Sequence, residues 1–149
     1  MRVCEEGQRA MGMSPYSCFN LIGAAQVGKS SLTGMRILHR INGKIPVWPF
    51  DPVPKEGPLV VEIYTSIAAR AAGIRKGLSK IRDRETLESA MAALGSKAPA
   101  KLARYDDHST DAILTAAWLR ANAHRAELWS PAAMTPQIAA TEGWTFGVP

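Results

Sequence analysis

The sequence contains only two cysteines, Cys4 and Cys18, and no apolar stretch approaches the ~20 residues that a membrane-spanning helix requires. Without a Cys-x-x-Cys pair or a histidine at metal-ligand spacing, the cysteines indicate neither a disulfide framework nor a zinc site, and they favour reduced thiols. Glu5 and Glu6 stand where a signal peptide needs a basic start followed by an apolar run. These absences predict a cytoplasmic protein that does not cross a membrane.

The composition is that of an ordinary globular protein. Of the 149 residues, 46% are hydrophobic and 21% are charged, which suffices for a buried core. The net charge of +5 favours polyanionic partners such as nucleic acid. Residues 70–84 contain six basic residues and a single acid, Asp83, and therefore predict a positive surface region for binding a polyanion. An ordinary solvated face explains these charges equally well. The six basic residues are Arg70, Arg75, Lys76, Lys80, Arg82 and Arg84.

Hydrophobic periodicity predicts one α/β domain over residues 17–149. Residues 1–16 have weak periodicity and contain Gly7, Gly12 and Pro15, so we expect a mobile lead-in there. The apolar and β-branched runs predict strands, and the recurrence of apolar residues every three or four positions predicts helices. The expected strands are 17–22, 59–64 and 144–148; the expected helices are 32–41, 66–72, 84–94 and 107–126, with a loop over 130–143.

Residues 23–30 match the phosphate-binding loop pattern Gly-x-x-x-x-Gly-Lys-Ser. In such a loop Gly23 and Gly28 would let backbone N–H groups approach phosphate oxygens, Lys29 would neutralise the β and γ phosphates, and Ser30 would ligate magnesium. A nucleotide hydrolase also needs an acidic residue at the end of a neighbouring strand and several parallel strands, and the sequence indicates neither. ATP or GTP binding is therefore an alternative function.

Three carboxylates form a second candidate site. Asp107 and Asp111 are four residues apart in the longest expected helix and therefore share one face, while Glu62 stands on the clearest expected strand. Carboxylate oxygens suit magnesium or manganese, and such sites hydrolyse phosphodiesters. Two simpler interpretations are open: Asp106 and Asp107 cap a helix, and Glu62 pairs with a basic neighbour.

Four segments resemble a family of uncharacterised predicted nucleases with a ribonuclease-H-like fold. They are residues 60–64, 80–82, 106–112 and 142–148, and the similarity extends from about residue 17 to the C-terminus. The resemblance implies an α/β fold with an incomplete sheet flanked by helices, and it implies that Glu62, Asp107 and Asp111 ligate Mg²⁺ or Mn²⁺. Under this interpretation Lys80 and Arg82 contact the phosphates of nucleic acid, and residues 25–29 form a loop and a helix start.

The sequence departs from this family at its beginning. A ribonuclease-H-like site takes an Asp from the first strand of an antiparallel unit, and residues 1–16 hold neither such strands nor an Asp. We therefore expect either a truncated or misassigned start, or a shortened relative without full activity. Because an incomplete sheet exposes an edge, we also expect a homodimer. A third alternative is a non-catalytic structural or dimerising fragment.

Overall fold

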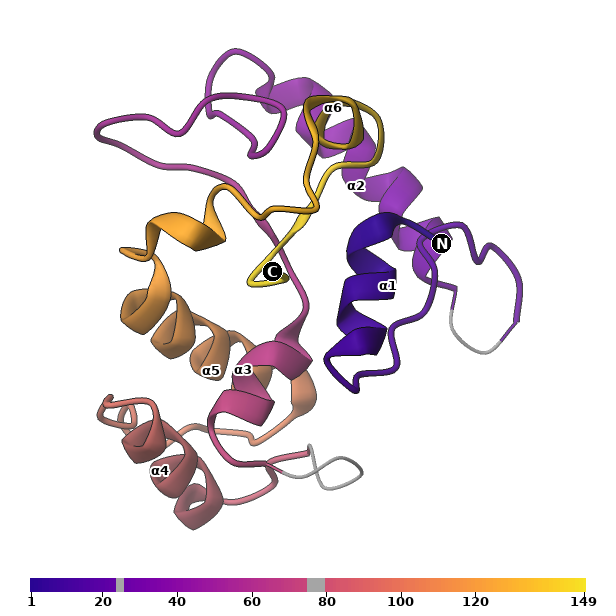
Figure 1. Ribbon diagram of the computed structural model, residues 1–149. Coiled ribbons are helices and arrows are strands. Elements are labelled where there is room, and N and C mark those ends of the chain that lie inside the picture. Colours follow the sequence, from indigo (N-terminus) through magenta and orange to yellow (C-terminus); the bar gives the residue numbers. More distant parts are fainter. Residues whose placement is uncertain (24–25, 75–79) are drawn as a thin grey trace. The chain divides into compact units, whose positions relative to one another are not determined.

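The computed structural model describes residues 1–23, 26–74 and 80–149, and it is a mostly helical mixed α/β structure (Figure 1). Among these residues the only sheet is a parallel pair formed by β1 and β2. No helix of the described residues is long and apolar enough to cross a membrane. The elements are α1 (Val3–Ala10), α2 (Val27–Ile41), β1 (Glu62–Ile63), α3 (Thr65–Ala71), α4 (Arg84–Ala93), α5 (Asp107–Asn122), the 3-10 helix η1 (Ala126–Leu128), α6 (Pro136–Glu142) and β2 (Thr145–Phe146).

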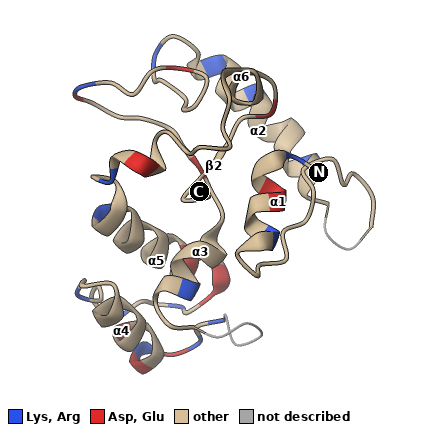
Figure 2. Cartoon of the chain, viewed as in Figure 1, with Lys and Arg blue, Asp and Glu red and all other residues tan. Residues whose placement is uncertain are grey.

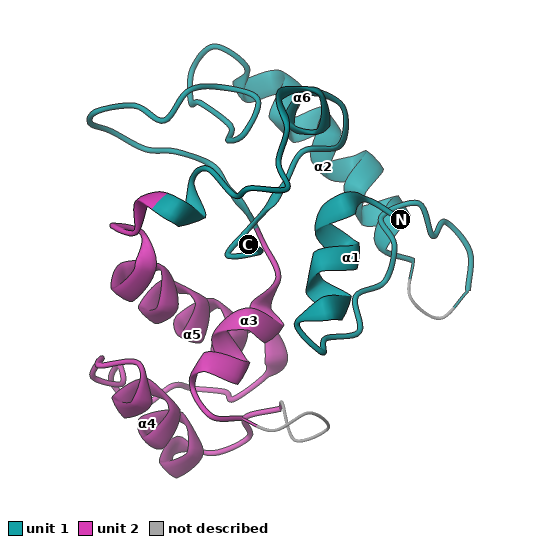
Figure 3. Ribbon diagram, viewed as in Figure 1, with its two compact units in different colours: residues 1–62, 127–149 teal, residues 63–126 magenta. Residues whose placement is uncertain are grey.

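The chain divides into two compact units (Figure 3). The single domain expected over 17–149 stays a prediction. Unit 1 consists of residues 1–62 together with residues 127–149. Unit 2 consists of residues 63–126. The C-terminal segment thus belongs with the N-terminal half of the chain, a grouping that local sequence patterns do not encode.

An aromatic cluster forms part of the core of unit 1. Phe146 is fully buried in β2, with its ring centroid 4.4 Å from that of Trp129 and 5.7 Å from that of Trp48. The buried Trp144 indole donates a hydrogen bond to the Val148 carbonyl at 3.0 Å. β2 can therefore be buried, because the Phe146 ring packs against other rings and the Thr145 hydroxyl forms a hydrogen bond with Glu62.

Unit 2 is built on α5, against which both α3 and α4 pack. Leu114 and Trp118 of α5 are buried, as are Ile67 of α3 and Leu87 of α4. The sequence correctly predicted these three helices, because apolar residues recur at helical spacing in each of them. Unit 2 is therefore a helical packing unit whose longest element carries the predicted carboxylates.

Side-chain caps explain why α4 and α5 begin where the sequence predicted. Asp83 accepts a hydrogen bond from the Thr86 amide at 2.8 Å, and Asp106 accepts one from the Ser109 amide at 2.9 Å. These bonds satisfy backbone donors that the first helical turn leaves unpaired. The simpler interpretation of Asp106 as a cap is thus confirmed. α5 nevertheless ends at Asn122, four residues earlier than expected.

Residues 1–16, which we expected to be a mobile lead-in, contain α1. At the start of this helix the Glu5 carboxylate accepts a hydrogen bond from the Arg2 amide at 2.9 Å, and Cys4, Glu5 and Gln8 are buried. The Val3 amide also donates to the Glu142 carboxylate at 2.8 Å. The helix is therefore stabilised by contacts with residues far away in the sequence, which a short window of sequence cannot reveal.

Two strand predictions need correction. Residues 17–22 form no strand: the Asn20 amide donates to the Ser17 carbonyl in a turn, and the Phe19 side chain is exposed. Local bonds of this kind compete with strand pairing, because they satisfy the same backbone groups. The strand expected over 59–64 is shortened to Glu62–Ile63, preceded by a single bridge between Val60 and Val47.

The expected loop over 130–143 contains α6. Thr135 caps this helix by accepting a hydrogen bond from the Ile138 amide at 3.2 Å, and Pro136 occupies its first turn. A threonine followed by a proline is a helix-start signal, since proline has no amide hydrogen to lose at that position. The proline that suggested a loop in fact marks the beginning of a helix.

Candidate functional site

Two carboxylates lie one turn apart at the start of α5. Asp107 is the first residue of the helix and Asp111 follows four positions later, so both side chains share one helix face. Lys80 Nζ lies 2.9 Å from Asp107 Oδ2, and Arg82 Nη1 lies 2.5 Å from Asp107 Oδ1. Thr65 Oγ1 donates a hydrogen bond to Asp111 Oδ2 at 3.2 Å. Unit 2 therefore gathers two carboxylates and two cations in one place.

Their neighbours shift the two carboxyl groups in opposite directions. Hydrogen bonds from Arg82 and Lys80 hold the pKa of Asp107 below its ordinary value of 3.8. Burial raises the pKa of Asp111, and the negative charge of Asp107 adds to the rise, while the Thr65 hydrogen bond opposes it. The ionised form is therefore favoured at Asp107 and disfavoured at Asp111.

Glu62, the first residue of β1, is bound by Arg2. Arg2 Nη1 lies 2.7 Å from Glu62 Oε2 and Nη2 lies 2.6 Å from Oε1, a bidentate arrangement. Thr145 Oγ1 in β2 donates to Glu62 Oε1 at 2.7 Å. Burial raises the pKa of Glu62, but the hydrogen bond and charge of Arg2 outweigh it, so the pKa is lowered. The interpretation of Glu62 as the partner of a basic side chain is thus confirmed.

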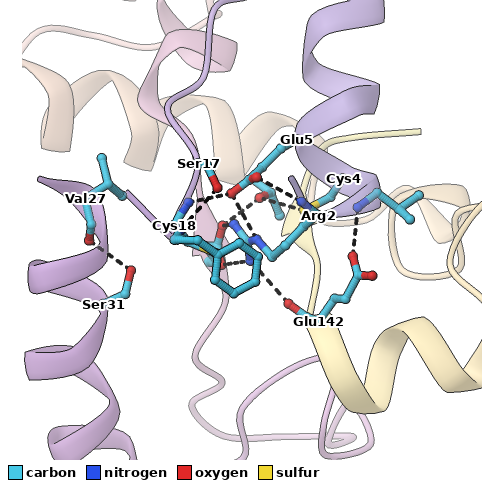
Figure 4. A network of polar contacts seen from close by, with 12 residues as sticks. Arg2, Cys4, Glu5, Ser17, Cys18, Val27, Ser31 and Glu142 are labelled. Carbon is cyan, nitrogen blue, oxygen red and sulfur yellow. Dashed lines mark hydrogen bonds and ion pairs between the residues drawn. The ribbon is translucent and has the colours of Figure 1, made fainter. Parts of the chain in front are cut away.

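The same guanidinium also contacts Glu5 (Figure 4). One cation thus bridges the carboxylates of Glu5 and Glu62. Arg2 Nε lies 3.2 Å from Glu5 Oε1, which also accepts a hydrogen bond from the Cys18 amide at 2.9 Å. Burial raises the pKa of Glu5, but bonds from the Cys18 amide and from Arg2 outweigh it, and the pKa is lowered. Arg2 therefore joins α1 to the strand that carries Glu62.

The structure brings Asp107 and Asp111 together, whereas Glu62 belongs to the other compact unit. Among the described residues, no group of three or more His, Cys, Asp or Glu side chains is arranged to hold a metal ion. The carboxylate pair on α5 is therefore the part of the predicted site that the geometry supplies. The participation of Glu62 stays a prediction of the resemblance.

The loop motif of residues 23–30 starts α2, and Ala24 and Ala25 within it lie outside the described residues. The Gly28 amide donates to the Asn20 carbonyl at 3.0 Å, and the Lys29 amide donates to the Gln26 carbonyl at 3.2 Å. A Cβ at Gly28 would lie 2.7 Å from the Cys18 carbonyl oxygen, so glycine permits close packing of the preceding turn. A phosphate would have to displace these bonds. Gly23 and Ser30 are exposed.

Sequence reasoning missed several residues that arrange the candidate site. Thr65 comes from α3, and nothing in its sequence neighbourhood links it to α5. Arg2 was not singled out, because it lies in the segment expected to be unstructured. Of the predicted basic region, Arg75 and Lys76 lie outside the described residues, and Arg84 pairs with Glu88 of the same helix. The acids Glu5 and Glu6 in the first turn and the basic Arg9 in the last turn, which suit the two ends of a helix, were the signal that could have revealed α1.

Comparisons with protein-family models, with curated proteins and with solved structures find no match to this chain.

Proposed function

We propose that this protein is a ribonuclease-H-like, metal-dependent nuclease relative that hydrolyses nucleic-acid phosphodiesters at the carboxylates of α5. One observation carries the proposal: Asp107 and Asp111 share a helix face, and Lys80 and Arg82 meet the first of them. Carboxylates beside basic groups are the two components that a phosphodiester site needs, one for a cation and one for the phosphate.

The donor chemistry of the pair fits Mg²⁺ or Mn²⁺. Both ions prefer hard oxygen ligands, and the pKa of Asp111 is raised because burial and the charge of Asp107 outweigh the Thr65 hydrogen bond. Asp107 and Asp111 would hold the ion, and the resemblance adds Glu62 as a further ligand. When bound, the metal would supply an activated water and stabilise the leaving oxygen.

The basic residues beside the pair have a role of their own. Lys80 and Arg82 are at least half exposed, so their ion pairs with Asp107 exchange readily with solvent. When a metal ion binds Asp107, the Lys80 and Arg82 side chains become available to a phosphate group. Arg82 can then donate two parallel hydrogen bonds to the phosphate. The two carboxylates would thus bind the metal ion, and the two basic side chains would bind the phosphate of the substrate.

The fold assignment belongs to the same proposal. Glu62 on β1 and the Asp-x-x-x-Asp-Ala start of α5 occupy the positions that the resemblance assigns to ligands. The described sheet is short, because each of its two strands consists of two residues. What supports the ribonuclease-H-like interpretation is therefore the order of a carboxylate strand and a carboxylate helix along the chain, rather than the extent of the sheet.

Asp111→Asn should reduce Mn²⁺-dependent cleavage of a fluorescent oligonucleotide by more than about 100-fold, since losing only a ligand's supporting bond costs 10- to 100-fold. Single-stranded and duplex substrates are compared in Mn²⁺ and in EDTA. Glu85→Gln removes an exposed carboxylate from α4 in the same unit and should cleave like the unaltered protein.

Equal cleavage by both variants would refute the assignment of the site. Absence of metal-dependent cleavage, combined with stabilisation by ATP that Lys29→Ala removes, would replace the proposal with nucleotide binding through residues 23–30.

A further inference from the structure

The net positive charge of this protein comes from one tract that has no acidic residue. Residues 7–50 contain no Asp or Glu, and their five basic residues account for the whole net charge of +5, because the other 13 Lys and Arg are balanced by 13 Asp and Glu. The five are Arg9, Lys29, Arg36, Arg40 and Lys44. α2 lies inside this tract and carries Lys and Arg but no acidic residue (Figure 2).

Helical spacing separates α2 into two opposite stripes. Ser31, Gly34, Leu38 and Ile41 recur every three or four residues and are all half-buried, which identifies the side that faces the protein. Lys29, Thr33, Arg36 and Arg40 recur with the same spacing on the opposite side and are all exposed. We call this second set the cationic stripe.

The three basic side chains of the stripe differ from five other basic side chains in forming no ion pair with a carboxylate of the described residues. Arg2, Lys80, Arg82, Arg84 and Arg104 all form ion pairs. Within the described ranges, by contrast, no carboxylate forms an ion pair with Lys29, Arg36 or Arg40. At a rise of ~1.5 Å per residue the stripe extends for about 16 Å along the helix, and unpaired cations in such a row attract a linear polyanion.

Apolar side chains beside the stripe indicate which polyanion it fits. Leu32 and Met35 lie between the two stripes and are more than half exposed. In a helix that binds a bilayer surface, the exposed face is centred on apolar residues. On α2 the exposed face is centred on basic residues, and the apolar residues lie at its margin. This arrangement suits a polyanion in which apolar groups lie beside the phosphates.

We propose that the cationic stripe of α2 binds the phosphates of single-stranded nucleic acid, with Leu32 and Met35 packing beside the unpaired bases. A single strand presents both groups together, whereas a duplex keeps its bases stacked inside. This surface lies in unit 1 and needs no metal, so it is a binding site additional to the carboxylate pair of unit 2.

The test is fluorescence anisotropy of a labelled single-stranded oligonucleotide in EDTA. The triple variant Lys29→Gln/Arg36→Gln/Arg40→Gln should weaken binding at least tenfold and reduce the slope of log affinity against log salt by about 2, since each phosphate contact contributes about 0.7. Glutamine retains helix propensity, and circular dichroism verifies the fold. The matched control, Lys55→Gln/Lys97→Gln/Lys101→Gln, removes the same charge from exposed positions elsewhere and should change affinity less than threefold.

Equal losses in both triple variants would overturn the proposal, because net charge alone would then explain binding. Binding to phosphatidylserine vesicles that requires the stripe, without oligonucleotide binding, would replace the proposed nucleic-acid ligand with a membrane surface.

Leu32→Ala/Met35→Ala should reduce the preference for single strands over duplex, and an unchanged preference would contradict the contact with bases. Asp111→Asn should bind the oligonucleotide normally in EDTA, so failure of the carboxylate site and failure of the stripe are distinguishable.

Discussion

Replacing Arg2 by methionine should lower the free energy of unfolding by about 3–5 kcal/mol, the cost of leaving a buried charge without its partner. The Arg2 and Glu5 side chains are 12% and 2% exposed, so neither solvent nor salt screens their interaction well. Loss of the guanidinium also removes two hydrogen bonds from the Glu62 carboxylate, to which Thr145 still donates one. Urea unfolding followed by circular dichroism measures the difference.

Arg9→Met is the matched control for this prediction, because Arg9 is an exposed residue of the same helix. Its effect should stay within about 0.5 kcal/mol, as for most surface substitutions. The double variant Arg2→Met/Glu5→Gln should recover part of the loss, since it no longer buries an unpaired charge. If Arg2→Met and Arg9→Met are equally stable, α1 does not depend on the Arg2 bridge.

Phe146→Ala should lower the free energy of unfolding by about 3–5 kcal/mol, as is usual when a buried aromatic side chain is removed. Phe146 is 0% exposed and contacts Trp48 and Trp129, so its deletion leaves a cavity in the core of unit 1. Phe19→Ala makes the same substitution at a side chain that is 69% exposed and should change stability by less than about 0.5 kcal/mol. Chemical denaturation of both variants checks this, and similar values would contradict the assignment of Phe146 to the core.

Local sequence patterns predicted the helices of unit 2 because their determinants are local. Asp83 and Asp106 cap α4 and α5, and the left-handed conformation of Gly95, with φ of 63°, follows the end of α4. The apolar spacing of α2 predicted its helix as well. It did not predict which side chains are covered, since Leu32 and Met35 belong to the same apolar pattern as Leu38 but are exposed.

The features that sequence reasoning missed depend on residues far apart in the chain. α1 is stabilised by Glu62 and Glu142, both of which lie more than fifty residues from Arg2. The apolar run 17–22 predicted a strand, but a strand forms only where another can pair with it, and the described residues supply none there. Spacing and the resemblance pointed to Asp107 and Asp111, and Lys80 was predicted as a phosphate contact, but the contacts that Lys80 and Thr65 make with these carboxylates arise only through tertiary packing.

The most direct test of the central claim is Mn²⁺ binding, followed by electron paramagnetic resonance of the free ion during titration. The account predicts that the unaltered protein binds Mn²⁺, that Asp111→Asn weakens this binding by at least about tenfold, and that Glu85→Gln leaves it unchanged. Binding that is equal in Asp111→Asn, or no binding by any of the three proteins, would contradict a metal site at the start of α5 and favour a non-catalytic structural fragment.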